Sequence, residues 1–280
     1  MPHALLIGAS SSIASYFKKS FDKNCLTFTE AGRHSELKVS LDCLDLDSLL
    51  LPPGITHAIF FAGITNIQYC EDHPEYSRLV NLTSTLSFIR HLNSQGVPCL
   101  FLSSSAVFSN TTRDTSELSL KDPNSIYGIL KSQVEDEILD SEFNAVLRIP
   151  KVLSKTTPLI DGWFSNLLSG VKIRPFFDLR LSPISFPTVS KFLYDWILCT
   201  EEYNRQKILH LSPSADITYH QLALYIANYL GVPHELVAPI SVSSLSRPLL
   251  FNPSQAFLSV TLPHSRSLNL NDEIKIMLQK

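Results

Sequence analysis

The sequence predicts an α/β protein with a doubly wound parallel sheet and a smaller C-terminal lobe. Short apolar runs without alternation, at residues 4–7, 57–61, 99–102 and 145–149, are typical of strands that are buried on both faces. Segments with helical spacing separate these runs, and the turns between them are short. Alternation of this kind predicts parallel strands with crossover helices on both sides of the sheet.

Composition sets limits on the function. The chain has 280 residues, 44% hydrophobic and 18% charged, which is enough to fold around one large core or a large and a small lobe. Its net charge of −3 is too mild to indicate a nucleic-acid surface. The nine histidines show no ligand spacing, so we expect no metal site.

The cysteines and the apolar segments predict a cytoplasmic protein. The five cysteines are odd in number and form no CxxC motif, which is typical of reduced thiols. The N-terminus passes directly into Ala4-Leu5-Leu6-Ile7, so we expect no secretory signal. No run of about 20 apolar residues occurs, so we expect no membrane span.

A glycine turn follows the first strand. Gly8, Ser11 and Ala14 occupy the three-residue spacing of the dinucleotide fingerprint, and Ser12 and Ile13 open the helix between them. Backbone N–H groups at such a helix start can hold a phosphate, so Gly8, Ser11, Ser12 and Ile13 are predicted cofactor contacts. Ser11 stands where glycine is usual, and it either bonds the phosphate or weakens its binding. The alternative is a tight strand–helix connection without a ligand.

Charged residues follow the next two predicted strands, at 26–29 and 39–42. Glu30 suits a ribose 2′-hydroxyl and Arg33 suits a 2′-phosphate, which slightly favours NADP over NAD. Either charge could equally belong to a solvated loop. Asp42 is predicted to accept a hydrogen bond from the adenine amine or, alternatively, to cap a following helix.

The fourth predicted strand, 57–61, ends in Phe61-Ala62-Gly63. Small residues at this point would let a cofactor lie across the strand ends. Helices are expected near 76–93, and Gln95-Gly96-Val97-Pro98 ends that segment.

The stretch from 99 to 131 carries the chemistry. A buried strand runs into Ser103-Ser104-Ser105, and a later helix carries Tyr127 and Lys131, four residues apart and so on one face. A cation near a phenol lowers its pKa from about 10, and a serine hydroxyl can hold a substrate oxygen against it. Carbonyl reduction needs this arrangement, with the hydride supplied by a cofactor. The alternative is an ordinary exposed Tyr–Lys pair.

The second half of the chain changes character after the strand at 145–149. Thr188 is predicted to cap a helix, a late strand is expected at 208–211, and Thr218 and Gln221 form a capping box for a helix that stops at Gly231. The tail from 232 to 280 is rich in loops.

These elements predict two lobes. Residues 1–150 form the dinucleotide-binding domain, to which 188–212 return. Residues 151–187 and 213–280, rich in proline and aromatic side chains at first, form the substrate-binding lobe.

Several motifs together resemble one family. They are Gly8-Ala-Ser-Ser-Ser-Ile-Ala14, Phe61-Ala-Gly63, Asn81, Ser103-Ser-Ser-Ala-Val-Phe108, Tyr127-Gly-Ile-Leu-Lys131 and Arg148. The chain resembles an extended short-chain dehydrogenase/reductase, closest to the dTDP-4-dehydrorhamnose reductase group of sugar-nucleotide enzymes. The resemblance implies a Rossmann fold with an NADP or NAD cofactor, a nucleotide-sugar substrate and a possible homodimer.

The resemblance also assigns roles by position. It implies that Ser104, Tyr127 and Lys131 are catalytic, and that Tyr127, Lys131 and Asn81 also contact the cofactor. Ser105 stands where the family usually has an acidic residue, and with Ser104 it is a predicted substrate contact.

The predicted substrate lies above the strand ends, beneath residues 151–187 and the tail. Three arginines, Arg174, Arg180 and Arg247, are candidates to meet its diphosphate, because a guanidinium fork matches phosphate oxygens. For each of them alone, an ordinary surface charge is the alternative.

Three functions remain open at this point. The first is NAD(P)H-dependent reduction of a nucleotide-linked keto-sugar. The second is a nucleotide-sugar 4-epimerase or dehydratase that keeps its NAD bound. The third is a catalytically silent NAD(P)-binding regulatory subunit, for which the regulatory subunit of methionine adenosyltransferase is a precedent in the same superfamily.

Overall fold

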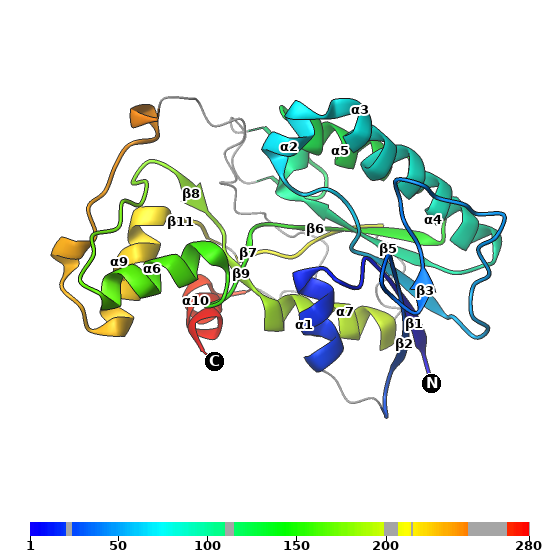
Figure 1. Cartoon of the computed structure of the whole chain (residues 1–280), viewed down its shortest axis with the longest axis horizontal. Helices are drawn as coiled ribbons and strands as arrows, with labels where there is room; N and C mark the ends of the chain where they lie inside the picture. The colour runs from blue at the N-terminus through cyan, green and yellow to red at the C-terminus, as the bar shows by residue number, and fades with distance from the viewer. Residues whose placement is uncertain (21–23, 110–114, 199–206, 214, 246–267, 280) are drawn as a thin grey trace.

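A seven-stranded, fully parallel sheet forms the centre of the larger lobe (Figure 1). The computed structural model describes residues 1–280 except 21–23, 110–114, 199–206, 214, 246–267 and 280. The strand order is β10-β6-β5-β4-β1-β2-β3. The strands are β1 (His3–Ile7), β2 (Thr27–Gly32), β3 (Leu37–Lys38), β4 (His57–Phe60), β5 (Cys99–Ser104), β6 (Asn144–Ile149) and β10 (Ile208–His210). The order reverses between β1 and β4, which confirms the predicted doubly wound sheet and locates its switch point.

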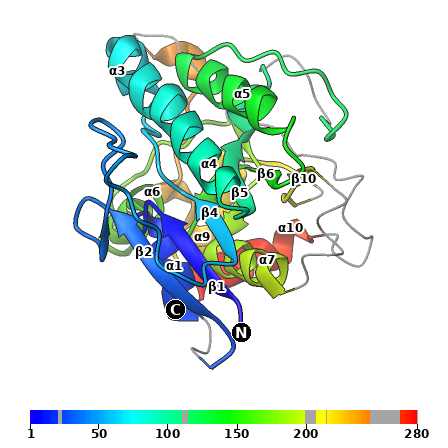
Figure 2. The ribbon, with the colours of Figure 1, turned by 90° about the vertical axis from the view of Figure 1, so that its right-hand side faces the viewer.

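Helices cover both faces of this sheet, because its central strands bury apolar side chains on both sides. Leu6 of β1 packs with Phe17 and Trp196 on the side of α1 (Ser12–Ser20) and α7 (Phe186–Leu198). Leu5 and Ile7 point the other way, toward α4 (Thr85–Ser94) and α5 (Ile126–Ile138). Figure 2 shows the sheet nearly end on, between these two helical layers. The segment before α4 is helical too: α2 (Ile67–Asp72), α3 (Pro74–Arg78) and the π-helical η1 (Leu79–Ser84).

The smaller lobe has its own apolar core. Its helices are α6 (Pro158–Leu168), α9 (Tyr219–Leu230) and α10 (Leu270–Leu278). Its short strands are β7 (Val152–Leu153), β8 (Arg180–Leu181), β9 (Ile184–Ser185) and β11 (Ile217–Thr218). Its short 3₁₀ turns are η3 (His234–Leu236) and η4 (Val242–Ser244). A third 3₁₀ turn, η2 (Ser105–Val107), directly follows β5 in the larger lobe. Strand β7 pairs in parallel with β9, and β8 pairs antiparallel with β11.

A buried carboxylate joins the last helix to the larger lobe. Glu273 of α10 accepts hydrogen bonds from the Ser185 N–H at 2.8 Å and from the Thr188 hydroxyl at 2.5 Å. These bonds hold the start of α7, which packs on α1. The sequence prediction that Thr188 caps this helix is therefore wrong, since α7 begins two residues earlier and Thr188 lies inside its first turn.

Two other predicted elements need correction. The strand predicted at 39–42 is irregular, and only Leu37–Lys38 pair with β2. Val39 and Leu41 do bury their side chains like strand residues, but the polar residues between and after them bond to Arg33 instead of extending a ladder. Helices α6 and α10 lie in segments that the sequence analysis left without helices. The capping box of Thr218 is confirmed, and α9 ends at Gly231 in the left-handed conformation, with φ of 68°.

Candidate active site

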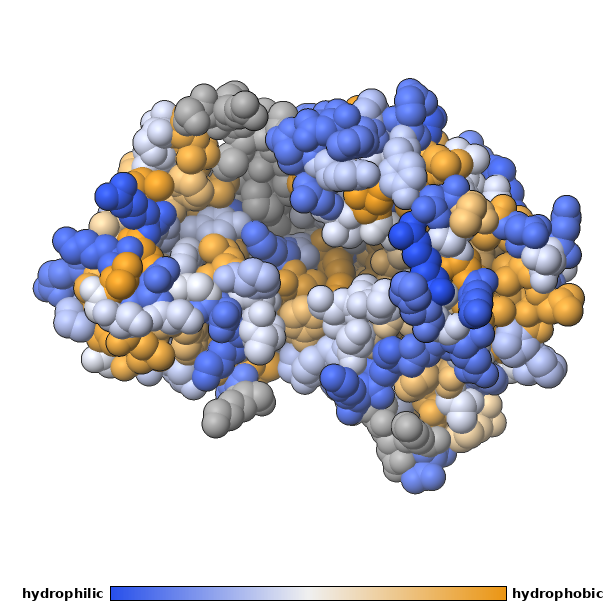
Figure 3. All heavy atoms as spheres, viewed as in Figure 1, coloured by the Kyte–Doolittle hydropathy of each residue, from blue (hydrophilic) through white to orange (hydrophobic). Residues whose placement is uncertain are grey.

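A cavity of about 760 Å³ lies beyond the carboxyl ends of β1, β4, β5 and β6, between the two lobes (Figure 3). Both lobes supply its walls. The lining residues are Ser11, Ser12, Ile13, Phe61, Thr65, Ile67, Leu102, Ser103, Ser104, Ser105, Tyr127, Lys131, Ile149, Pro150, Lys151, Val152, Ser154, Thr156, Thr157, Pro158, Leu179, Phe186 and Tyr219. A parallel sheet is expected to bind its ligand at this position.

The predicted catalytic residues come together in this cavity. Ser104 ends β5, and its hydroxyl accepts the Ala106 N–H at 3.2 Å, which starts the turn η2. Ser104 and Tyr127 both line this cavity. Lys131, one turn further along α5, donates to the carbonyl of Leu102 at 2.9 Å. The strand end and the helix therefore present a hydroxyl, a phenol and an ammonium to one space.

Gly128 makes this convergence possible. A Cβ atom at Gly128 would lie 2.1 Å from the Ala106 carbonyl oxygen, so no other residue fits here without moving the backbone. The start of α5 is fixed from two sides: the Ser125 hydroxyl accepts the Gly128 N–H at 3.1 Å, and the Glu71 carboxylate accepts the Ile126 N–H at 2.7 Å. The close approach places Tyr127 beside the end of β5.

Burial sets the protonation of the site. Desolvation raises the pKa of Tyr127 to about 12, although the Ser104 hydroxyl opposes the rise. Desolvation also lowers the pKa of Lys131 to about 8, partly offset by the charge of Glu135. The sequence predicts that the lysine lowers the tyrosine pKa. Here burial prevails, so near neutral pH the phenol keeps its proton and can act as a donor.

Asn81 supports the site from a π-helical turn, a distortion that often marks functional positions. Its side-chain amide clamps Ile64, accepting the N–H at 2.7 Å and donating to the carbonyl at 2.9 Å. This fixes Gly63, where φ is +145° and an added Cβ would lie 4.0 Å from the Lys131 ammonium. Phe61 lines the cavity, whereas Ala62, Gly63 and Asn81 are not among its lining residues.

The glycine turn has the geometry of a phosphate site. Gly8 has a φ of +84°, and a Cβ there would lie 2.6 Å from the Ala62 nitrogen, so glycine is required. Ser11 caps α1, with its hydroxyl accepting the Ala14 N–H at 3.2 Å. Ser11, Ser12 and Ile13 all line the cavity. A helix start that opens into a cavity favours a bound phosphate, and the turn fits a dinucleotide.

Arg33 and Asp42 lie just beyond β2 and contact each other rather than the cavity. Their ion pair spans 2.6 Å, Arg33 also donates to Ser40 at 2.8 Å, and the Tyr76 hydroxyl donates to Asp42 at 3.1 Å. The bond from Ser40 lowers the pKa of Asp42. No helix follows Asp42 in the described residues before 67, so its predicted alternative role as a helix cap is wrong.

The structure does not bring Arg174 or Arg180, two of the three predicted substrate arginines, to the cavity. Arg180 pairs with Asp216, Arg174 is exposed, and neither lines the cavity; Arg247 lies outside the described residues. Lys151, which sequence reasoning missed, does line it. The sequence could have indicated this position, because Lys151 follows Pro150 at the carboxyl end of a predicted parallel strand.

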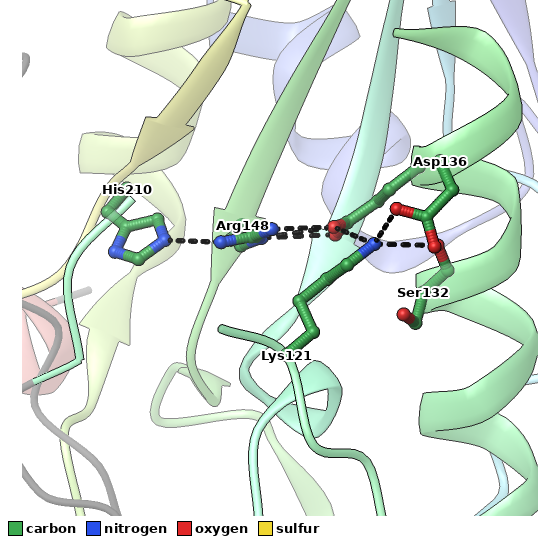
Figure 4. A network of polar contacts seen from close by, with 6 residues as sticks. Lys121, Ser132, Asp136, Arg148 and His210 are labelled. Carbon is green, nitrogen blue, oxygen red and sulfur yellow. Dashed lines mark hydrogen bonds and ion pairs between the residues drawn. The ribbon is translucent and has the colours of Figure 1, made fainter. Parts of the chain in front are cut away.

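A buried ionic network braces α5, the helix that carries Tyr127 and Lys131 (Figure 4). Arg148 of β6 bonds the carboxylate of Glu135, with a closest distance of 2.7 Å, and also contacts His210 of β10 at 3.2 Å. Lys121 reaches the same carboxylate at 3.4 Å and Asp136 at 2.7 Å. Glu135 stands one turn after Lys131, so the network fixes α5 against β6.

Two other observations concern metal ions and membranes. The described residues hold no group of three or more His, Cys, Asp or Glu side chains placed to bind a metal ion. Among the same residues, no helix has both the length and the apolar character to cross a membrane.

Comparison with known proteins agrees with this geometry. A relative is methionine adenosyltransferase 2 subunit beta of Xenopus laevis, 25% identical over 261 residues, 88% of this chain and 78% of that protein. A dTDP-4-dehydrorhamnose reductase from Bacillus anthracis, solved with NADP, superimposes with a TM-score of 0.85 at 13% identity, covering 99% of both chains.

A further solved structure with the same fold is a UDP-N-acetylglucosamine 4-epimerase from Methanobrevibacter ruminantium in complex with UDP-N-acetylmuramic acid. Its TM-score is 0.76 at 15% identity, covering 98% of this chain and 97% of that one. Residues 3–268 of the present chain match the RmlD substrate binding domain family. That match spans nearly the whole sequence and confirms the resemblance inferred from its motifs: the chain belongs to the RmlD substrate binding domain family.

Proposed function

We propose that this protein reduces a keto-sugar carried on a nucleotide, with NADPH or NADH as the reductant. The observation that carries the proposal is the convergence of Ser104, Tyr127 and Lys131 on a cavity that also receives the start of α1. Its support from relatives is the family match and the solved reductase that holds NADP.

The cofactor would lie along the strand ends. The turn of Gly8 with Ser11, Ser12 and Ile13 would hold its diphosphate, and Arg33 and Asp42 stand at the end of β2, where the adenosine ribose of this fold class binds. The side chain of Arg33 is 59% exposed although it pairs with Asp42, and a guanidinium at this position favours NADP. When bound, the reduced nicotinamide supplies the hydride.

Side chains of the protein would carry out the proton transfer. Tyr127 keeps its phenolic proton near neutral pH and is placed to donate it to the substrate oxygen as negative charge develops there. The Ser104 hydroxyl orients that oxygen, and the Lys131 ammonium, held by Leu102, stabilises the phenolate that remains. Apolar walls from Leu102, Ile149 and Val152 limit access of water.

The test is consumption of NADPH or NADH by purified protein with a panel of nucleotide-linked keto-sugars. We expect turnover that Tyr127→Phe abolishes while cofactor affinity stays within about twofold, since the phenol is needed for protonation and the phosphate contacts lie elsewhere. Equal turnover in the variant would refute the assigned chemistry.

Two alternatives keep specific support. The relative from Xenopus laevis is a subunit of an enzyme, which favours a regulatory protein. Ser11 replaces a glycine of the phosphate turn, which favours a protein that does not use the cofactor in a reaction. The fold shared with a UDP-N-acetylglucosamine 4-epimerase keeps the epimerase alternative, in which the protein would hold its NAD tightly. Absorbance and fluorescence of the purified protein separate them: retained NAD supports the epimerase, and binding without turnover on every keto-sugar supports the regulator.

A further inference from the structure

The charged side chains that line the cavity are all cationic. Among the described residues that line it, only Lys131 and Lys151 carry a charge, and none is an aspartate or glutamate. Lys131 is committed to the catalytic end, where it bonds the Leu102 carbonyl. A hollow lined by cations without carboxylates has a positive potential, which attracts an anionic ligand.

Lys151 is held beside the catalytic strand by its backbone. Ile149 of β6 pairs in register with Ser104 of β5, and Lys151 follows two residues later. At about 3.3 Å per residue, its Cα lies roughly 7 Å beyond the level of Ser104 along the strand direction. The Lys151 carbonyl accepts the Ile184 N–H at 3.1 Å, which fixes the backbone against β9.

The Lys151 side chain is held by Tyr219, which carries no charge that would neutralise the ammonium. Its ammonium donates to the hydroxyl of Tyr219 at 3.2 Å and lies 5.5 Å from the centroid of that ring. Tyr219 is itself buried, packs edge-on against Trp163 and begins α9. Within the described part of the chain, no carboxylate lies within 4.0 Å of Lys151. An ammonium has three donors, so two remain for a ligand.

Further donors surround the same wall of the cavity. The hydroxyls of Ser154, Thr156 and Thr157 line it, and they precede α6. Thr157 stands at the N-cap of α6, yet its side chain caps none of the helix's own N–H groups. The helix start adds a partial positive charge next to these hydroxyls. Hydroxyls, a lysine and a helix start are the groups that bind phosphate oxygens.

We propose that Lys151, steadied by Tyr219, binds the phosphate of the nucleotide-linked substrate and thereby selects nucleoside diphosphate compounds over uncharged ones. This deepens the proposed function and rests on it for the substrate class. Lys151 takes the role that the sequence analysis gave to Arg174, Arg180 and Arg247. It lies on the cavity wall, whereas Arg174 and Arg180 do not.

Calorimetry with the full chain and NADP⁺ tests this directly, with dTDP and UDP against thymidine and uridine as probes. We expect the diphosphates to bind at least about tenfold more tightly than the nucleosides, and Lys151→Gln to remove that preference. Lys151→Arg should retain most of it, and Tyr219→Phe should lose about threefold, because the lysine keeps its charge but loses its anchor. Rising salt should weaken diphosphate binding less in Lys151→Gln than in the wild type.

Lys155→Gln is the matched control, since its ammonium lies over Phe164 at 5.2 Å and it is not among the lining residues. Its affinities should equal those of the wild type. Unchanged diphosphate binding in Lys151→Gln, an equal loss in Lys155→Gln, or no diphosphate binding by the wild type would each overturn the proposal. The proposed function fails separately: Lys151-dependent binding without turnover refutes the reductase alone, and turnover with an unchanged KM in Lys151→Gln refutes the phosphate role alone.

Discussion

Replacing Gly128 with alanine should separate α5, which carries Tyr127 and Lys131, from the end of β5, which carries Ser104. The added Cβ would lie 2.1 Å from the Ala106 oxygen, whereas ordinary contacts begin near 3.4 Å, so α5 and η2 must move apart by about 1.3 Å. Misplacement by about 1 Å can cost about 100-fold in rate. Overpacking of this kind typically destabilises by about 1–3 kcal/mol, against a gain in helix propensity of up to about 1 kcal/mol.

Two measurements check this prediction. Turnover of Gly128→Ala should fall about 100-fold with cofactor affinity little changed, and its free energy of unfolding in urea should fall by about 1 kcal/mol or more. Gly162→Ala is the control, because Gly162 lies inside α6 with nothing within 4 Å of its added Cβ. That variant should gain about 0.5–1 kcal/mol and keep its activity. If Gly128→Ala gained as much stability as Gly162→Ala, the close contact would be refuted.

Three other perturbations follow from the site. Ser11→Gly should leave cofactor affinity equal or better and cost only a few tenths of a kcal/mol in stability, because glycine is an adequate N-cap; a tenfold weaker cofactor would show that the hydroxyl is a phosphate ligand. The pKa of Lys131 is lowered to about 8 from 10.5, so the unfolded chain binds more protons between these values and stability should rise with pH there. Urea titrations of Lys131→Met should lack that rise, and an identical slope in both proteins would contradict the assignment. Glu135→Gln leaves the buried Arg148 without its anion and should lower the free energy of unfolding by about 3–5 kcal/mol. Glu137→Gln breaks an exposed pair with Arg90 and should lower it by less than about 1 kcal/mol. Similar losses in the two variants would mean that the network does not brace α5.

The sequence predicted the parts of the site that depend on local pattern. The serines were predicted to end a strand, and Tyr127 and Lys131 were predicted to share one face of the next helix. In a parallel sheet these two positions meet at the carboxyl ends of the strands, so their convergence followed from the sheet topology. The position of the glycine turn followed from the same rule. The pKa of Tyr127 could not be predicted in this way, because it depends on how completely α5 and η2 exclude water.

Features that depend on tertiary packing were also missed. The alternation of Val39 and Leu41 is that of a strand, but Arg33 draws Ser40 and Asp42 into an irregular loop. Lys151 was passed over for three arginines, since only the folded chain shows which cations lie on the cavity wall. The π-helical turn that carries Asn81 has no sequence signal of its own.

The bond from Glu273 to the start of α7 has a consequence for how the protein is made. The larger lobe needs α7 to cover the sheet beside α1, yet the carboxylate that holds the first turn of α7 is encoded 85 residues after Thr188. A ribosome would have to release residue 273 before that turn is satisfied. We therefore expect the two lobes to unfold together in one transition, and a fragment ending before residue 269 to expose the face that α10 covers. Cutting the gene between the lobes would not yield two independent domains.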